Sequence, residues 1–195
     1  KNGSPSLMHS KHLAKKIQTA VGSNHKVELA MRYKNPSIKD VLERMKKEGY
    51  HKIIVFPLFP HYASSSTGSA LQEVMEHISK WWVIPELKII SQYYNDTNYI
   101  NCIVNRAKKY NLNDYEHIVF SYHGLPERQV DKVYNDGYLC KDHNCETESS
   151  YENYYCYKAA CFQTTELIVK QLNLPKEKYT VSFQSRLDKK WLTPF

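Results

Sequence analysis

The segment Ile118-Val119-Phe120-Ser121-Tyr122-His123-Gly124-Leu125-Pro126 joins an apolar run to a turn that contains Gly and Pro. Residues 117–122 have the length and apolar character of a buried β-strand, and the turn follows at once. An earlier segment, Ile54-Val55-Phe56-Pro57-Leu58-Phe59-Pro60-His61, is similar to it. The similarity predicts two related α/β halves, residues 1–94 and 95–195. A chance likeness between two buried strands is the alternative.

The rest of the chain alternates between helical and strand periodicity. Helices are expected where apolar residues recur three or four positions apart, at residues 4–22, 36–49, 69–80, 98–110 and 158–172. Strands are expected at residues 27–33, 53–59, 87–92, 117–122 and 179–183. The unbroken apolar run 53–59 is typical of a strand buried on both faces. Strands alternating with helices predict an α/β fold of open, mostly parallel sheets flanked by helices.

The composition is that of a globular protein, with 42% hydrophobic and 24% charged residues among 195. A net charge of +7 is spread along the chain rather than gathered in one basic stripe, which argues against nucleic-acid binding.

The apolar runs are shorter than the roughly 20 residues of a membrane-spanning helix, and no signal-peptide pattern follows Lys1. We therefore expect a cytoplasmic protein, with peripheral contact to the inner face of the membrane left open. Because the first residue is not Met, we expect the N-terminus to lie upstream.

The carboxyl ends of the strands are the expected positions for ligand-binding residues in such sheets. Arg32 lies at the end of the first predicted strand. Its guanidinium group can bind an anionic ligand or form an ion pair with Asp40. The Ser-rich loop 61–69 precedes a helix and suits either anion binding or helix capping. His123 begins the loop after the fourth strand, where imidazole can accept a proton or bind a metal; a structural role is the alternative. Of the other histidines, His61 has the sequence setting most similar to that of His123.

Four of the five cysteines lie close together in the sequence: Cys140, Cys145, Cys156 and Cys161. They belong to a polar, Tyr-rich insertion at about residues 131–157 and to the start of the next helix. Such clustering is typical of a metal or cluster site rather than of a disulfide framework. Four-cysteine zinc sites accept similar spacings, and Cys161 is also explained as a thiol buried in a helix. Cys102 stands alone in an apolar helical pattern and is expected to be buried.

Six motifs, taken in chain order, resemble those of ferrochelatase, the enzyme that inserts ferrous iron into a porphyrin at the end of haem synthesis. They are Gly3-Ser4-Pro5, Met31-Arg32-Tyr33 with Pro36, Pro57-Leu58-Phe59-Pro60, the Ser-rich loop with Thr67 and Gly68, Phe120-Ser121-Tyr122-His123-Gly124-Leu125-Pro126, and Ser182-Phe183-Gln184-Ser185-Arg186 with Trp191-Leu192-Thr193-Pro194. The resemblance implies a chelatase-like fold of two similar α/β halves with a porphyrin cleft between them. The substrates that it implies are ferrous iron and either protoporphyrin IX or coproporphyrin III.

The resemblance also implies roles for individual residues. His123 matches the active-site histidine of the family, described as a ligand of the substrate iron or as the acceptor of pyrrole protons. Arg32 and Tyr33 match residues that line the porphyrin cleft, and Trp191 matches an aromatic residue that packs beside the macrocycle. Anchoring of the porphyrin propionates is expected from two residues of the Ser-rich loop, Ser65 and Thr67.

Two departures from the family pattern bear on these expectations. Family members begin with a strand and a Gly-rich loop that should precede Lys1, and they continue beyond Phe195. That later part carries the acidic residue, usually Glu, that faces the active-site histidine. Both sheets are therefore expected to be incomplete in this chain. The second departure is His61, which stands where the family often has Gln.

The cysteine spacing fits the same resemblance. Some ferrochelatases carry a [2Fe–2S] cluster, and in one bacterial group its ligands lie largely in an internal insertion after the histidine loop. That region holds the four clustered cysteines, so the resemblance implies a [2Fe–2S] cluster on Cys140, Cys145, Cys156 and Cys161, with zinc as the alternative. Two other functions stay open: a cobalt chelatase of corrin synthesis, and a non-catalytic module that binds porphyrin, an iron–sulfur cluster or zinc.

Overall fold

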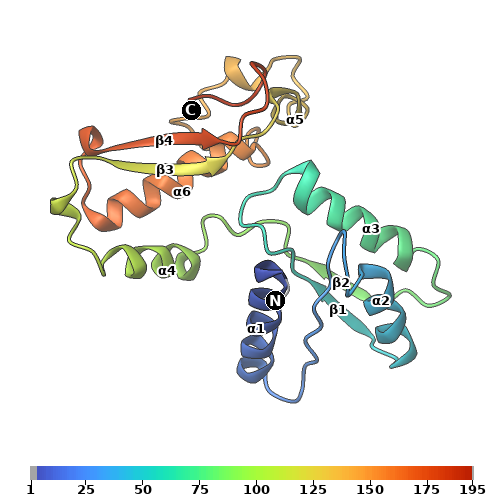
Figure 1. Ribbon diagram of the computed structural model, residues 1–195. Coiled ribbons are helices and arrows are strands. Elements are labelled where there is room, and N and C mark those ends of the chain that lie inside the picture. The colour runs from blue at the N-terminus through green and yellow to red at the C-terminus, as the bar shows by residue number, and fades with distance from the viewer. Residues whose placement is uncertain (1–3, 195) are drawn as a thin grey trace. The chain divides into compact units, whose positions relative to one another are not determined.

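The structure, a computed structural model, describes residues 4–194, so Gly3 of the first motif lies outside the described residues (Figure 1). The chain forms two compact units. The first contains the residues up to Val55 together with Ser69–Ile89, and the second contains Phe56–Gly68 together with the residues from Ile90 onward. The division into two related halves at residues 94 and 95 stays a prediction.

The first unit begins with a helix whose ends follow the predicted signals. Helix α1 (Pro5–Val21) has Ser4 as its N-cap and a proline in its first turn. Gly22 ends it with a φ of 70°, a conformation in which glycine avoids the steric cost of a side chain. Helix α2 (Ile38–Lys47) starts at Ser37, whose hydroxyl oxygen accepts a hydrogen bond from the Asp40 amide at 3.1 Å.

Two helices cover one small sheet in this unit. Strands β1 (Lys52–Val55) and β2 (Glu86–Ile89) pair in parallel, with Ile53 opposite Leu87. Helix α3 (Ser69–Ile78) joins α2 on this sheet. Their shared core consists of Ile38, Leu42, Ile53, Val74, Ile78 and Trp81.

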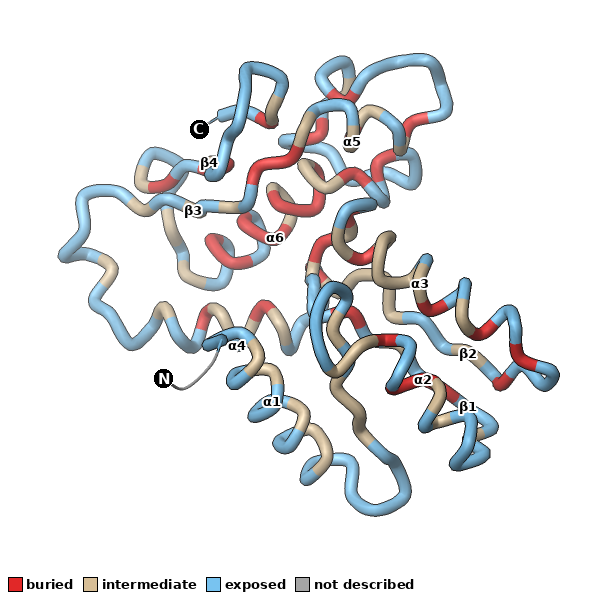
Figure 2. Tube along the Cα trace, turned by 45° about the vertical axis from the view of Figure 1, so that its right-hand side comes forward, coloured by how far each residue is buried: buried red, intermediate tan, exposed pale blue. Residues whose placement is uncertain are grey.

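The second unit is organised by helix α6 (Tyr157–Leu172), which lies along the sheet of β3 (Ile118–His123) and β4 (Tyr179–Gln184) (Figure 1). The strands are parallel and in register to their carboxyl ends, where His123 pairs with Gln184. Helix α4 (Thr97–Ala107) packs against α6. Buried positions recur along α6 in Figure 2, as expected for a helix covered on several sides.

Short helical segments complete the described structure. Helix α5 (Glu127–Asp131) follows the His123 loop, and a π-helical turn forms Ser64–Gly68. Three 3-10 turns lie at Leu112–Asp114, Cys140–Asp142 and Lys176–Lys178. Two small parallel sheets flanked by helices confirm the predicted α/β class.

The strand predicted over residues 27–33 is wrong. Met31 forms a single bridge to Ser37, and its amide donates to the Pro36 carbonyl at 2.7 Å. A strand needs a hydrogen-bonded neighbour along its length. Within residues 4–194 this stretch has no such neighbour, so the described chain contains four strands instead of the five expected.

The apolar run 53–59 is also shorter as a strand than predicted. Strand β1 ends at Val55, and Pro57 follows, which has no N–H to donate to a ladder. Ile54 is 49% exposed, so within the described residues the expectation of burial on both faces is wrong. Cys102 is exposed on α4, which corrects the expectation that it is buried.

Candidate active site

His123 is the last residue of β3, and its side chain is exposed. Its backbone carbonyl accepts a hydrogen bond from the Tyr157 hydroxyl at 2.9 Å. The next amide, of Gly124, donates to the Gln184 carbonyl at 2.7 Å. Both polar groups of the peptide after His123 therefore have a fixed partner, and the imidazole is presented to solvent at the carboxyl edge of the sheet.

Backbone contacts hold the loop after His123 against the C-terminal segment of the chain. A bridge joins Pro126 to Trp191, and the Leu192 amide donates to the Leu125 carbonyl at 2.9 Å. The half-buried Trp191 ring packs against Gly124, where a β-carbon would lie 3.5 Å from its Cε3 atom. The structure thus brings Trp191 and the His123 loop together, although they are far apart in sequence.

Arg32 and Tyr33 lie in the first unit and are both exposed. The Arg32 Nε donates to the Ser69 hydroxyl at 2.9 Å, and its guanidinium group pairs with Glu73 at 2.5 Å. The guanidinium carbon also lies 4.7 Å from the centre of the Tyr33 ring. Arg32 therefore pairs with Glu73, rather than with Asp40 as the alternative interpretation expected.

The Ser-rich loop places its two predicted site residues differently. Ser65 is exposed on the π-helical turn Ser64–Gly68. Thr67 is fully buried, and among the described residues its hydroxyl has no hydrogen-bond partner. Ser65 is therefore accessible to a ligand, whereas Thr67 is not.

His61, the alternative candidate to His123, is a buried residue among aromatic rings. Its Nε2 lies 2.8 Å from the Thr164 hydroxyl of α6. The rings of Tyr94, Tyr122 and Tyr157 lie 5.4 to 6.0 Å from the His61 ring, centre to centre. Burial lowers the pKa of His61 to about 4, because a charged imidazole would lose its hydration there. The environment indicates a neutral structural histidine.

Three of the predicted metal ligands come together in the second unit. The sulfur atoms of Cys140, Cys145 and Cys156 lie 3.6 to 3.8 Å from one another, and all three residues are buried. The Tyr134 hydroxyl lies 2.8 Å from the Cys145 sulfur. Cys161 is fully buried in the same apolar core, but its sulfur is outside this group of three.

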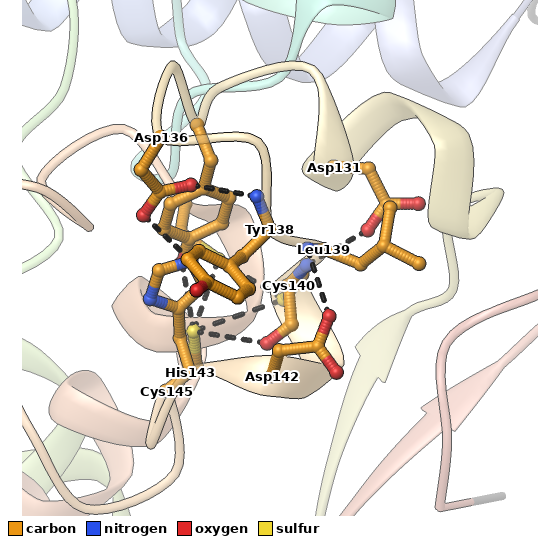
Figure 3. Close-up of polar contacts among 10 residues, drawn as sticks. Asp131, Asp136, Tyr138, Leu139, Cys140, Asp142, His143 and Cys145 are labelled. Carbon is orange, nitrogen blue, oxygen red and sulfur yellow. Dashed lines mark hydrogen bonds and ion pairs between the residues drawn. The ribbon is translucent and has the colours of Figure 1, made fainter.

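Acidic side chains shape the loop that carries two of these cysteines (Figure 3). The Asp131 carboxylate accepts a hydrogen bond from the Cys140 amide at 2.9 Å, and Asp142 accepts one from the Leu139 amide at 3.0 Å. Asp136 accepts a hydrogen bond from the Tyr138 amide at 2.9 Å. These contacts fix the backbone around Cys140 without a sheet ladder, which explains why the segment shows no periodicity in the sequence.

The three thiols also set each other's ionisation. Hydrogen bonding with the Cys140 and Cys145 thiols lowers the pKa of Cys156, because these contacts favour its thiolate form. Hydrogen bonding with Cys145 and Cys156 raises the pKa of Cys140. The three residues offer a soft, sulfur-only donor set, which is the chemistry that zinc and iron–sulfur centres use.

A family model for ferrochelatase matches residues 1–195. The chain belongs to the ferrochelatase family. It is 41% identical over 194 residues to a protein named ferrochelatase from Legionella pneumophila strain Philadelphia 1, covering 99% of this chain and 57% of the relative. It is 39% identical over 197 residues to a ferrochelatase of Coxiella burnetii strain Dugway 5J108-111, covering 99% of this chain and 54% of the relative. The chain thus spans little more than half the length of these ferrochelatases.

The family assignment confirms the resemblance seen in the six motifs and does not favour a cobalt chelatase. Among residues 4–194, no helix is long and apolar enough to cross a membrane. Sequence reasoning missed Tyr157, which contacts the backbone of the motif histidine. Its position directly after Cys156 was the only available signal, and nothing in the sequence shows where its hydroxyl group points.

Proposed function

We propose that the full-length protein containing this chain is a ferrochelatase, which inserts ferrous iron into a porphyrin in haem synthesis. The observation that carries the proposal is the presentation of His123. An exposed imidazole stands at the end of a parallel strand, its backbone is held on both sides, and an aromatic ring packs beside its loop. Family membership supplies the reaction class.

The chemistry of metal insertion suits a histidine at this position. Binding of Fe²⁺ by the four porphyrin nitrogens displaces two pyrrole N–H protons, so two protons must leave for each iron bound. A neutral imidazole can accept one of these protons near pH 7. Because His123 is exposed, it can release that proton to water and then accept the second.

Contacts with the porphyrin are proposed for the residues that match the family pattern. The flat face of Trp191 suits stacking on a porphyrin. Arg32 uses its Nε and one terminal nitrogen within the protein, which leaves further N–H donors for a propionate carboxylate. Tyr33 is 76% exposed beside it, and the Ser65 hydroxyl is accessible on the Ser-rich loop.

The cysteine group is proposed to hold a metal centre. Two sulfur ligands on one tetrahedral metal ion, with bonds of about 2.3 Å, lie about 3.8 Å apart. The three sulfur–sulfur distances of 3.6, 3.7 and 3.8 Å have this value, so the residues fit metal–thiolate coordination. Such a centre would stabilise the insertion, since binding free energy becomes folding free energy where the apo segment is weakly held.

The proposed occupant is a [2Fe–2S] cluster. It needs a fourth thiolate, and Cys161 is a fully buried cysteine of the same core, at the end of the first turn of α6. Because each iron takes two cysteines, one of the three sulfurs would have to move away from the other two on binding and share the second iron with Cys161. A zinc ion bound by Cys140, Cys145 and Cys156 would instead keep the triangle and leave Cys161 free.

The test compares wild-type and His123→Ala full-length protein. Loss of a proton acceptor should reduce iron insertion by roughly 10²- to 10⁴-fold, while porphyrin affinity changes little. His117→Ala, an exposed histidine just before β3, is the matched control and should keep its activity. Protoporphyrin IX and coproporphyrin III are assayed in parallel. Turnover of the His123 variant near the wild-type rate would contradict the proposal.

The cytoplasmic location, with or without peripheral contact to the membrane, stays a prediction. Fractionation of cells that express the full-length protein tests it. Recovery of the protein in the soluble fraction supports the cytoplasmic prediction, and release from membranes by salt supports peripheral contact.

A further inference from the structure

Helix α6 begins between the cysteine group and the histidine loop. Cys156 is its N-cap residue, and Tyr157 is its first helical residue. The Cys156 sulfur lies 3.6 Å from the Cys140 sulfur, and the Tyr157 hydroxyl donates to the His123 carbonyl at 2.9 Å. A single peptide bond therefore joins a proposed metal ligand to the residue that holds the backbone of the proposed proton acceptor.

The ring of Tyr157 has little freedom to move independently of the helix. It lies edge-on to His61, with ring centres 5.8 Å apart, and tilted against Phe183 of β4 at 6.4 Å. His61 is itself hydrogen-bonded to Thr164 of the same helix at 2.8 Å. Because rings pack against Tyr157 on two sides, a shift of the start of α6 is passed to the tyrosine hydroxyl rather than absorbed by rotation of the ring.

The His123 end of this contact is equally constrained. The carbonyl of His123 and the amide of Gly124 belong to one planar peptide unit. Tyr157 holds the carbonyl at 2.9 Å, and Gln184 holds the amide at 2.7 Å. Together with the preceding residues of β3, this peptide unit sets the direction of the Cα–Cβ bond of His123, from which the imidazole projects.

We propose that Tyr157 is a positioning residue that couples occupancy of the cysteine site to the placement of His123. The inference rests on the proposed function of His123 and deepens it. A metal centre on Cys156 fixes the first turn of α6, and the Tyr157 hydroxyl then holds the peptide after His123. Without the metal centre, the start of α6 is free to shift and the hydrogen bond weakens. The coupling is mechanical and needs no electron transfer.

The test uses Tyr157→Phe in the full-length protein, which removes the hydroxyl group and keeps the ring contacts. A neutral hydrogen bond contributes about 0.5 to 1.5 kcal/mol, so kcat should fall by roughly 2- to 10-fold, while the KM for porphyrin stays within about 2-fold. Amide hydrogen exchange of residues 123–125 is measured on the same samples, with the cysteine site loaded and after treatment with a chelator. The iron, zinc and acid-labile sulfide contents of each sample are determined.

In the wild type, removal of the metal should speed exchange at residues 123–125. In Tyr157→Phe, exchange should already be fast with the site loaded, and removal of the metal should change it little further. Tyr94→Phe is the matched control, because it removes a hydroxyl that bonds to Gln163 of α6 at 3.1 Å and does not touch His123. It should leave both the exchange rates and their response to metal as in the wild type.

Three results would overturn the coupling. The first is wild-type exchange at residues 123–125 that does not respond to metal, and the second is Tyr157→Phe exchange that responds as the wild type does. The third is a loss of bound metal in Tyr157→Phe that equals its loss of activity. The exchange measurements need no turnover, so an inactive wild type would contradict the proposed function while the coupling is still tested.

Discussion

The β-carbon that an alanine would add at Gly124 would lie 2.8 Å from the carbonyl oxygen of Gln184, the residue paired with His123 at the ends of β3 and β4. Real β-carbons do not approach a backbone oxygen so closely, and the oxygen belongs to a strand that cannot yield cheaply. The glycine after the motif histidine therefore permits the close approach of the two strand ends that holds the His123 peptide.

Gly124→Ala should consequently displace the histidine loop. We expect a loss of about 1–3 kcal/mol in the free energy of unfolding and at least a tenfold lower rate of metal insertion. Urea unfolding and steady-state assays of the full-length protein measure these changes. Val119→Ala, at an exposed position of the same strand, is the control and should alter the rate little. An alanine variant with unchanged stability and rate would show that the strand ends are not so constrained.

Trp191→Ala should weaken porphyrin binding. An aromatic stacking contact contributes about 0.5–1.5 kcal/mol beyond its buried area, so the Kd should rise by roughly 3-fold or more. Trp191→Phe should restore much of the affinity because it keeps a flat ring. Porphyrin titration followed by absorbance measures the Kd, and thermal unfolding checks that each variant is folded.

Trp82→Ala provides the matched control for this titration. Trp82 is 99% exposed in the first unit, so its removal takes away a tryptophan without removing a packed ring. A Kd that rises equally in the Trp82 and Trp191 variants would contradict a specific role for Trp191.

Replacement of single cysteines by serine should separate the two candidate occupants. Cys140→Ser, Cys145→Ser and Cys156→Ser should each lose most of the bound metal, because each removes one sulfur of the group. Cys161→Ser should also abolish a [2Fe–2S] cluster, which needs four thiolates, whereas a zinc site formed by the other three should persist. Iron, zinc and acid-labile sulfide analysis of anaerobically purified protein measures the outcome.

The exposed Cys102 is the control for the cysteine series. Cys102→Ser should keep the full metal content and the visible absorption of the wild type. Wild-type protein that contains neither metal nor sulfide after anaerobic purification would contradict a metal centre at these cysteines.

Local signals in the sequence predicted most of the helices. Ser4 with Pro5, Gly22 and Ser37 mark the ends of α1 and the start of α2 through hydrogen bonds and backbone conformations that involve only nearby residues. The strand predicted over residues 27–33 failed because a strand depends on a distant partner. Its apolar residues have the right spacing, yet no neighbouring strand pairs with them in the described chain.

The residues of the candidate site also differ in whether local sequence signals could predict them. His123 was predictable because a strand, a turn and a family motif coincide at one position. The roles of Tyr157, Thr164 and Gln184 depend on where β4 and α6 lie beside β3, which no local pattern encodes. Four clustered cysteines indicated a metal, but the separation of Cys161 from the other three sulfurs becomes visible only in three dimensions.

His61 should make the second unit sensitive to acid. Its pKa is lowered to about 4 in the folded chain because the imidazole is buried, whereas an unfolded histidine has a pKa of about 6.5. Between these values the unfolded chain binds a proton that the folded chain does not. The free energy of unfolding should therefore fall as the pH decreases from about 6.5 to 4, and should lose about 2 kcal/mol between pH 7 and pH 5 from this group.

His61→Gln should reduce this dependence, because glutamine does not titrate and its amide can still bond to the Thr164 hydroxyl. Urea unfolding of the wild type and the variant at pH 7 and pH 5 measures the difference. The variant should lose about 2 kcal/mol less than the wild type over this interval, whatever its stability at pH 7. His9→Gln, at an exposed position of α1, is the control and should keep the wild-type pH dependence. Equal losses in the wild type and in His61→Gln would mean that His61 is not held neutral, and that its contact with Thr164 does not depend on an uncharged ring.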